Sequence, residues 1–122
     1  MGKILSVSNQ KGGVGKTTTS INLGAALVKQ GQRVLLIDMD PQGNATTGLG
    51  KSNNDEQKNI YNLLIGKITL EQSIQMSNIG SLDLISSNVN LSGLEVETAN
   101  EANRAFILKE ILKKNNSIIN KY

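Results

Sequence analysis

The chain has 122 residues, enough for one small domain, with 38% hydrophobic residues and a formal net charge of +3. It contains no cysteine and no histidine, which excludes disulfides, thiolate metal sites, cysteine nucleophiles and the commonest general base. Its apolar runs are too short to span a bilayer. Its lysines are mostly scattered, so an ordinary solvated surface explains the charge more simply than a DNA-binding face.

The first predicted elements are a short buried strand over residues 4–7, a glycine-rich loop, and a helix that begins near Thr17. The loop reads Lys11, Gly12, Gly13, Val14, Gly15, Lys16, Thr17, Thr18. Its glycines allow the backbone to turn successive N–H groups toward phosphate oxygens. Lys16 would place a positive charge against the β and γ phosphates, and Thr17 would offer a hydroxyl to Mg²⁺. The loop therefore predicts a triphosphate site rather than a turn that binds nothing.

This loop departs from the usual pattern G-x-x-x-x-G-K-[ST] at its start. Gln10 stands where the first glycine is expected, and an additional lysine, Lys11, precedes the glycine pair. One loop can direct only one lysine easily at its own γ phosphate. Lys11 is therefore expected to act elsewhere.

The predicted helix continues with apolar residues at helical spacing and stops at Gly31, a residue typical of a helix C-cap. Residues 34–37 then form a continuous apolar run, which indicates a strand covered on both faces of a parallel sheet. Strand, helix and strand make one βαβ unit, whose connection we expect to be right-handed.

Two carboxylates, Asp38 and Asp40, follow this strand directly. We expect them at the same sheet edge as the phosphate loop, because ligands of open α/β sheets bind at the carboxyl ends of the strands. Pro41 ends the strand, and the glycines and amides after it predict a mobile loop. An acidic turn that caps a helix is the alternative interpretation.

These two stretches resemble the ParA/MinD superfamily of P-loop ATPases, whose deviant Walker A loop is similar to residues 11–18. The resemblance implies that Lys11 reaches the partner's ATP across a sandwich dimer and that Gly12 lies where the two loops approach. It also implies that Asp40 orients the attacking water and that Asp38 lies in the second shell of Mg²⁺. Two short sequences after the strand resemble the ParA/Soj partitioning branch of this superfamily. They are Asp-Pro-Gln-Gly-Asn-Ala-Thr, which begins at Asp40, and Gly-Leu-Gly, which begins at Gly48.

The resemblance implies an ATP-hydrolysing protein of chromosome or plasmid segregation, with ATP and Mg²⁺ as its ligands. It further implies an ATP-dependent homodimer, non-specific DNA binding, a ParB-type partner protein and a cytoplasmic, nucleoid-associated location without membrane binding. One alternative is a non-catalytic remnant of such an ATPase. A MinD-like membrane-associated regulator is a weaker alternative, and the absence of cysteine excludes a nitrogenase iron protein.

Farther along the chain we expect an exposed loop over residues 51–59, a short helix over 60–65, and a second helix beginning at 70–74 with Thr69 and Glu71 in cap-like positions. Residues 82–87 predict a third strand, and apolar spacing from Leu91 onward predicts helical packing. Leu49, Leu63 and Leu64 are expected in the core rather than at a partner surface.

The predicted fold class is therefore α/β, a P-loop NTPase with a parallel sheet flanked by helices. Residues 1–122 are expected to be the N-terminal portion of one ATPase domain, which the family pattern continues with the Walker B strand.

Overall fold

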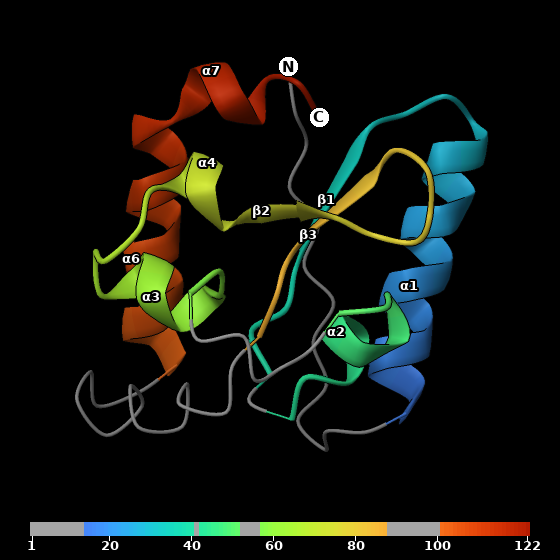
Figure 1. Ribbon diagram of the computed structural model, residues 1–122, viewed down its shortest axis with the longest axis horizontal. Coiled ribbons are helices and arrows are strands. Elements are labelled where there is room, and N and C mark those ends of the chain that lie inside the picture. The colour runs from blue at the N-terminus through green and yellow to red at the C-terminus, as the bar shows by residue number, and fades with distance from the viewer. Residues whose placement is uncertain (1–13, 41, 52–56, 88–100) are drawn as a thin grey trace.

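The computed structural model describes residues 14–40, 42–51, 57–87 and 101–122, with helical side chains described from residue 18 in the first helix and residue 104 in the sixth. A small central sheet separates two groups of helices (Figure 1). On one face lie α1 (Val14–Lys29) and α2 (Asn44–Gly48). On the other lie α3 (Ile60–Leu64), α4 (Leu70–Ser73), α6 (Glu101–Lys114) and α7 (Asn116–Ile119).

The sheet contains β1 (Val34–Ile37), β2 (Ile74–Met76) and β3 (Leu82–Ile85) in the order β1-β3-β2. β1 and β3 pair in parallel, as predicted, with Val34 opposite Leu82. β2 pairs antiparallel to β3, so the expectation of a purely parallel sheet is wrong for this strand. β2 was not predicted because it has only three residues and starts immediately after a helical turn. Three residues are too few to show the alternation of apolar and polar side chains that is typical of a strand.

Alternating side chains of β1 and β3 build two separate cores, because successive residues of a strand point to opposite faces. Val34, Leu36, Leu82 and Leu84 pack in the core beneath α1, together with Leu49. The side chains that point the other way join a second core with α3, α4 and α6; they are Leu35, Ile37 and Ile85. Covering on both faces explains the continuous apolar runs of these strands.

Helix α1 packs closely on the sheet and ends where the sequence predicted. A Cβ atom on Gly24 would lie 3.2 Å from Leu82 Cδ1, so glycine allows the close approach. The helix closes with Gly31 at φ 84°, and the Gln32 amide donates to the Leu27 carbonyl over 3.0 Å. The helix begins at Val14, earlier than the predicted start near Thr17.

The short helices on the other face begin with side-chain caps. Asn59 accepts a hydrogen bond from the Asn62 amide over 2.8 Å. Thr69 and Gln72 form a capping box, in which each side chain accepts from the other residue's amide. The predicted cap at Thr69 is confirmed, although its partner is Gln72 and not Glu71.

Other sequence expectations divide into those the structure settles and those outside the described residues. Leu49, Leu63 and Leu64 are buried, as predicted, whereas Asn59 is buried at the end of a loop expected to be exposed. The predicted strand at 4–7, the loop up to Gly13, residues 52–56 and the helical start at 91–100 lie outside the described residues. No described helix is both long and apolar enough to cross a membrane.

We predict that Leu84→Ala lowers the free energy of unfolding by roughly 2–5 kcal/mol, because Leu84 is fully buried beneath α1. Met76→Ala is the matched control, since Met76 is 76% exposed and should change stability by less than about 0.5 kcal/mol. Urea unfolding followed by circular dichroism measures both values. Equal losses in the two variants would contradict the assigned core.

Candidate functional site

The start of α1 provides the backbone environment expected of a phosphate site. Val14, Gly15, Lys16 and Thr17 form its first turn, which contains no acidic residue, and Thr18 follows with an exposed side chain. The first N–H groups of a helix lack intrahelical acceptors, and the helix dipole is positive at this end. The helical part of the predicted strand-loop-helix order is thus confirmed. Lys11, Gly12 and Gly13 lie outside the described residues, and their roles remain predictions.

Asp38 lies immediately after β1 and extends its pairing, because its amide donates to the Ile85 carbonyl over 3.1 Å. Its side chain is only 5% exposed. Oδ2 accepts hydrogen bonds from the Thr46 amide at 2.9 Å and from the Thr46 hydroxyl at 2.6 Å. Oδ1 accepts one from the Asp40 amide at 3.1 Å. One carboxylate therefore holds both ends of the segment between residues 40 and 46.

Thr46 connects this carboxylate to the end of β3. Its side chain is fully buried, and Oγ1 accepts a hydrogen bond from the Ser87 amide at 2.8 Å while donating to Asp38. The segment expected to be a mobile loop therefore contains a helical turn, α2, whose third residue is bound by Asp38. The N-cap residue of α2 is Gly43, without a side-chain cap bond, and the Asp38 carboxylate instead accepts from the amide of the third helix residue.

Asp40 lies in a tight turn beside this network. Its carboxylate accepts a hydrogen bond from the Gln42 amide over 3.0 Å. Its carbonyl accepts from the Gly43 amide at 2.9 Å and from the Ser87 hydroxyl. Gly43 has φ 68°, a left-handed conformation that glycine adopts without steric cost. These contacts leave the Asp40 side chain half-buried at the carboxyl edge of the sheet.

Burial raises the pKa of Asp38 above its ordinary value, because a low-dielectric environment disfavours the charged form. The hydrogen bonds from Thr46 and Asp40 lower the pKa, and the nearby Asp40 charge raises it slightly. Burial is the largest effect, so the net direction is upward. Asp38 thus combines a buried charge with several donors, which is typical of a group that fixes local structure.

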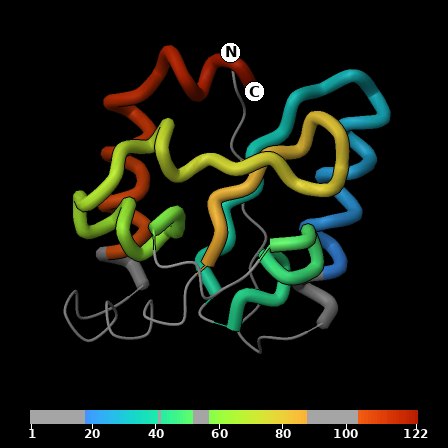
Figure 2. The backbone as a smooth tube through the Cα atoms, in the orientation of Figure 1, coloured from blue at the N-terminus to red at the C-terminus, as the bar shows by residue number. Residues whose placement is uncertain are grey.

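Helix α2 brings the Asp38–Thr46 segment to the N-terminal half of α1. A Cβ atom on Gly48 would lie 2.9 Å from Ile21 Cδ1, which shows how closely the two helices approach. Figure 2 shows α2 beside the blue portion of α1. The structure therefore places Asp38 and Asp40 on the same side of the sheet as the start of α1.

Sequence analysis assigned no role to Thr46 or Ser87. Thr46 lies in the stretch expected to be a loop, and Ser87 ends the third predicted strand. Ser87 could have been found, because the carboxyl ends of adjacent parallel strands meet at one sheet edge. Thr46 gave no comparable signal, since its contact with Asp38 depends on the turn at Gly43.

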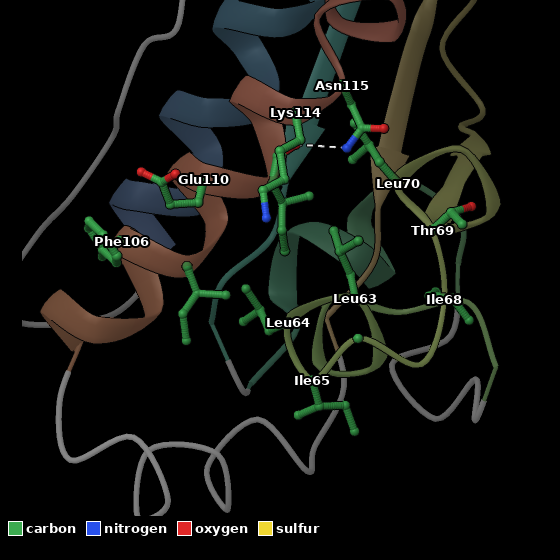
Figure 3. Close-up of a pocket in the computed structure, with 13 residues that line it drawn as sticks. Leu63, Leu64, Ile65, Ile68, Thr69, Leu70, Phe106, Glu110, Lys114 and Asn115 are labelled. Atoms are coloured by element: carbon green, nitrogen blue, oxygen red, sulfur yellow. Dashed lines mark hydrogen bonds between the residues drawn. The ribbon is translucent and has the colours of Figure 1, made fainter.

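A groove lies on the opposite face of the sheet, between the α3–α4 region and α6 (Figure 3). This groove of about 530 Å³ is lined mainly by aliphatic side chains and Phe106, with Glu110 and Lys114 also present. It contains none of the residues that the sequence assigned to nucleotide. The segment of residues 38–46 beside α1, which we call the switch segment, is therefore the candidate functional site.

We predict that Thr46→Val lowers the free energy of unfolding by roughly 2–4 kcal/mol, because it leaves the buried Ser87 amide and one Asp38 oxygen without their hydroxyl partner. Thr46→Ser keeps the hydroxyl and should lose only about 1 kcal/mol for the missing methyl group. Equal losses in urea unfolding of the two variants would show that the hydroxyl contributes nothing.

Asp38→Asn should change the pH dependence of stability. The pKa of Asp38 in the folded chain lies above its ordinary value of 3.8. As the pH rises from 3.8 through the folded-state pKa, the unfolded chain has released this proton while the folded chain still holds it. The carboxyl group therefore costs stability progressively across this window, and the unmodified chain should weaken relative to Asp38→Asn. Urea unfolding with a metal chelator, from about pH 3 to about pH 7, measures the difference. A relative gain by the unmodified chain would mean that the hydrogen bonds outweigh burial.

The chain is similar to known proteins over most of its length. The model of the family described as AAA domain matches residues 2–122. Sporulation initiation inhibitor protein Soj of Bacillus subtilis is 46% identical over 113 residues, which cover 93% of this chain and 45% of Soj. Chromosome partitioning protein ParA of Caulobacter vibrioides is 44% identical over 111 residues, which cover 91% of this chain and 42% of ParA. The chain thus spans about half the length of these relatives.

A solved structure shows the same fold. Cobyrinic acid a,c-diamide synthase from Mycobacterium smegmatis, with bound ADP and magnesium, superposes with a TM-score of 0.83 at 38% identity. The match covers 93% of this chain and 46% of that one. The predicted α/β P-loop fold class is confirmed. The chain belongs to the AAA domain family, and its similarity to Soj and ParA confirms the predicted resemblance to the ParA/Soj type.

Proposed function

We propose that this chain binds ATP with Mg²⁺ and provides the phosphate-binding part of a ParA/Soj-type partition ATPase. One observation carries the proposal: α1 starts inside the predicted phosphate loop, and α2 holds the Asp38–Asp40 turn beside the same helix. ADP and magnesium in the cobyrinic acid a,c-diamide synthase structure support the ligand class. Because one fold carries many functions, the partition assignment rests on the Soj and ParA relatives.

The phosphate-binding residues follow from the loop sequence and the helix that it starts. Residues 12–18 would direct their amides at the phosphates, and Lys16 would neutralise phosphate charge. Thr17 would hold Mg²⁺ through its hydroxyl, with Asp38 behind it in the second shell. The ion would screen the negative charge that develops on the phosphate oxygens. The acid-free first turn of α1 is compatible with such an anionic ligand.

Asp40 is the proposed catalytic residue for hydrolysis, as the group that orients the attacking water. The chain has no histidine, so a carboxylate is the natural candidate for accepting a proton. Lys11 would complete the site in trans, by contacting the ATP of a second copy. Placement of Asp40 at the sheet edge near α1 supports its role.

Partners and location belong to the proposal for the whole protein. An ATP-dependent homodimer, non-specific DNA binding and stimulation by a ParB-type protein are what the resemblance to ParA and Soj suggests. These would give a cytoplasmic, nucleoid-associated protein of chromosome or plasmid segregation. A non-catalytic remnant of such an ATPase, which would bind nucleotide without turning it over, is the second candidate.

Lys16→Ala tests ATP binding. Loss of a charged phosphate contact should weaken the affinity for a fluorescent ATP analogue roughly 10- to 100-fold in the presence of Mg²⁺. Lys29→Ala removes an exposed lysine from the last turn of the same helix and should leave the affinity unchanged. Equal affinities for the unmodified chain and Lys16→Ala would refute the phosphate site.

Asp40→Ala separates binding from turnover. We expect nucleotide affinity within about twofold of the unmodified chain, and phosphate release reduced by roughly 10²–10⁴. Undiminished turnover would exclude Asp40 as the catalytic residue. Nucleotide binding without any turnover in the unmodified chain would instead favour the second candidate.

A further inference from the structure

We propose that Ser87 is a positioning residue for Asp40. Its hydroxyl attaches the turn at Asp40 to the end of β3. The inference rests on the proposed function for its catalytic meaning, but its structural content stands on contacts within the described residues. Ser87 is fully buried and contacts the switch segment at two points.

The two contacts of Ser87 hold opposite ends of one short segment. Its hydroxyl donates to the Asp40 carbonyl, and its amide donates to Thr46 Oγ1 over 2.8 Å. These partners are separated in sequence from Ser87 by 47 and 41 residues, so both bonds are tertiary. A single residue at the end of β3 therefore holds the beginning and the end of the segment between residues 40 and 46.

The Asp40 carbonyl is also the acceptor that closes the local turn. It receives the Gly43 amide at 2.9 Å, while the Asp40 carboxylate receives the Gln42 amide at 3.0 Å. The hydroxyl of Ser87 thus anchors a turn that already orients the Asp40 side chain from within. Without this hydroxyl the turn would lose its direct side-chain attachment to β3, and its internal bonds at the Gln42 and Gly43 amides would open more often.

Such an anchor matters for a water-orienting carboxylate. Catalytic groups must be held close to their productive geometry, and a displacement of about 1 Å can reduce turnover by roughly 10². Asp38 also holds both ends of this segment, through the Asp40 amide and Thr46, but it does so from the end of β1. Ser87 contributes the attachment to the neighbouring strand.

The adjacent Ser86 offers a matched control. It is also fully buried, and its hydroxyl also donates to a backbone carbonyl, that of Lys58, over 2.7 Å. Ser86→Ala therefore removes the same type of hydrogen bond from the residue that directly precedes Ser87. Its hydroxyl contacts are with Lys58 and Gln75, away from the Asp40 turn.

Amide hydrogen exchange in the nucleotide-free chain tests the attachment. Ser87→Ala should accelerate exchange at the Gln42 and Gly43 amides by about tenfold or more, because loss of the anchor lets the turn open locally. Ser86→Ala should leave these two amides within about twofold of the unmodified chain. Ser87→Cys, which keeps the volume but donates weakly, should be intermediate and serves if the alanine variant fails to fold. Unchanged exchange in the Ser87 variants would overturn the inference.

Steady-state ATP hydrolysis tests the positioning role. Ser87→Ala should lower kcat about tenfold or more with KM for ATP within about twofold, whereas Ser86→Ala should change neither. Equal kcat losses in the two variants would indicate general destabilisation and contradict positioning. Absence of turnover in the unmodified chain would count against the proposed catalysis alone, and the exchange result would still decide whether Ser87 anchors the turn.

Discussion

The buried hydrogen bonds between Asp38 and Thr46 are the constraint on which the candidate site depends. They fix the segment after β1, whose glycines and amides favour no single conformation, while Leu49 packs in the core beneath α1. The Asp38 carboxylate gives up hydration on burial, and hydrogen bonds from the following segment offset part of that cost. The same contacts give α2 its start and place Asp40 in a defined turn.

The sheet makes this arrangement possible by bringing distant segments to one edge. Parallel pairing of β1 with β3 puts Asp38 and Ser87 at neighbouring strand ends, although 48 intervening residues separate them in the sequence. Two cores on opposite faces fix the strands, one beneath α1 and one beneath α3, α4 and α6. Core packing therefore sets the distance across which Thr46 can join the two strand ends.

How well each feature could be predicted depends on how far apart in the sequence the residues that stabilise it are. The main strands, the end of α1 and the cap at Thr69 depend on short patterns, and the sequence was sufficient for them. The antiparallel strand β2 was missed because three residues contain too little pattern, and α2 was missed because its third residue, Thr46, bonds to Asp38 and Ser87, which lie outside the helix. The strand pattern could place Ser87 at the same sheet edge as Asp38, but its individual hydrogen bonds, to residues more than forty positions away, could not be predicted. The roles of Lys11, Lys16 and Thr17 remain predictions from motif and resemblance.

The start of α1 and the Asp38–Asp40 turn lie on the same side of the sheet, in a chain similar to Soj and ParA. The central claim is that one bound nucleotide affects both the start of α1 and the Asp38–Asp40 turn. Amide NMR of the 122-residue chain, titrated with a non-hydrolysable ATP analogue and Mg²⁺, tests this directly. The account predicts shifts that saturate together at residues 14–18 and 38–46, with little change in α7. Shifts confined to the groove between α3 and α6, or none at the start of α1, would contradict it.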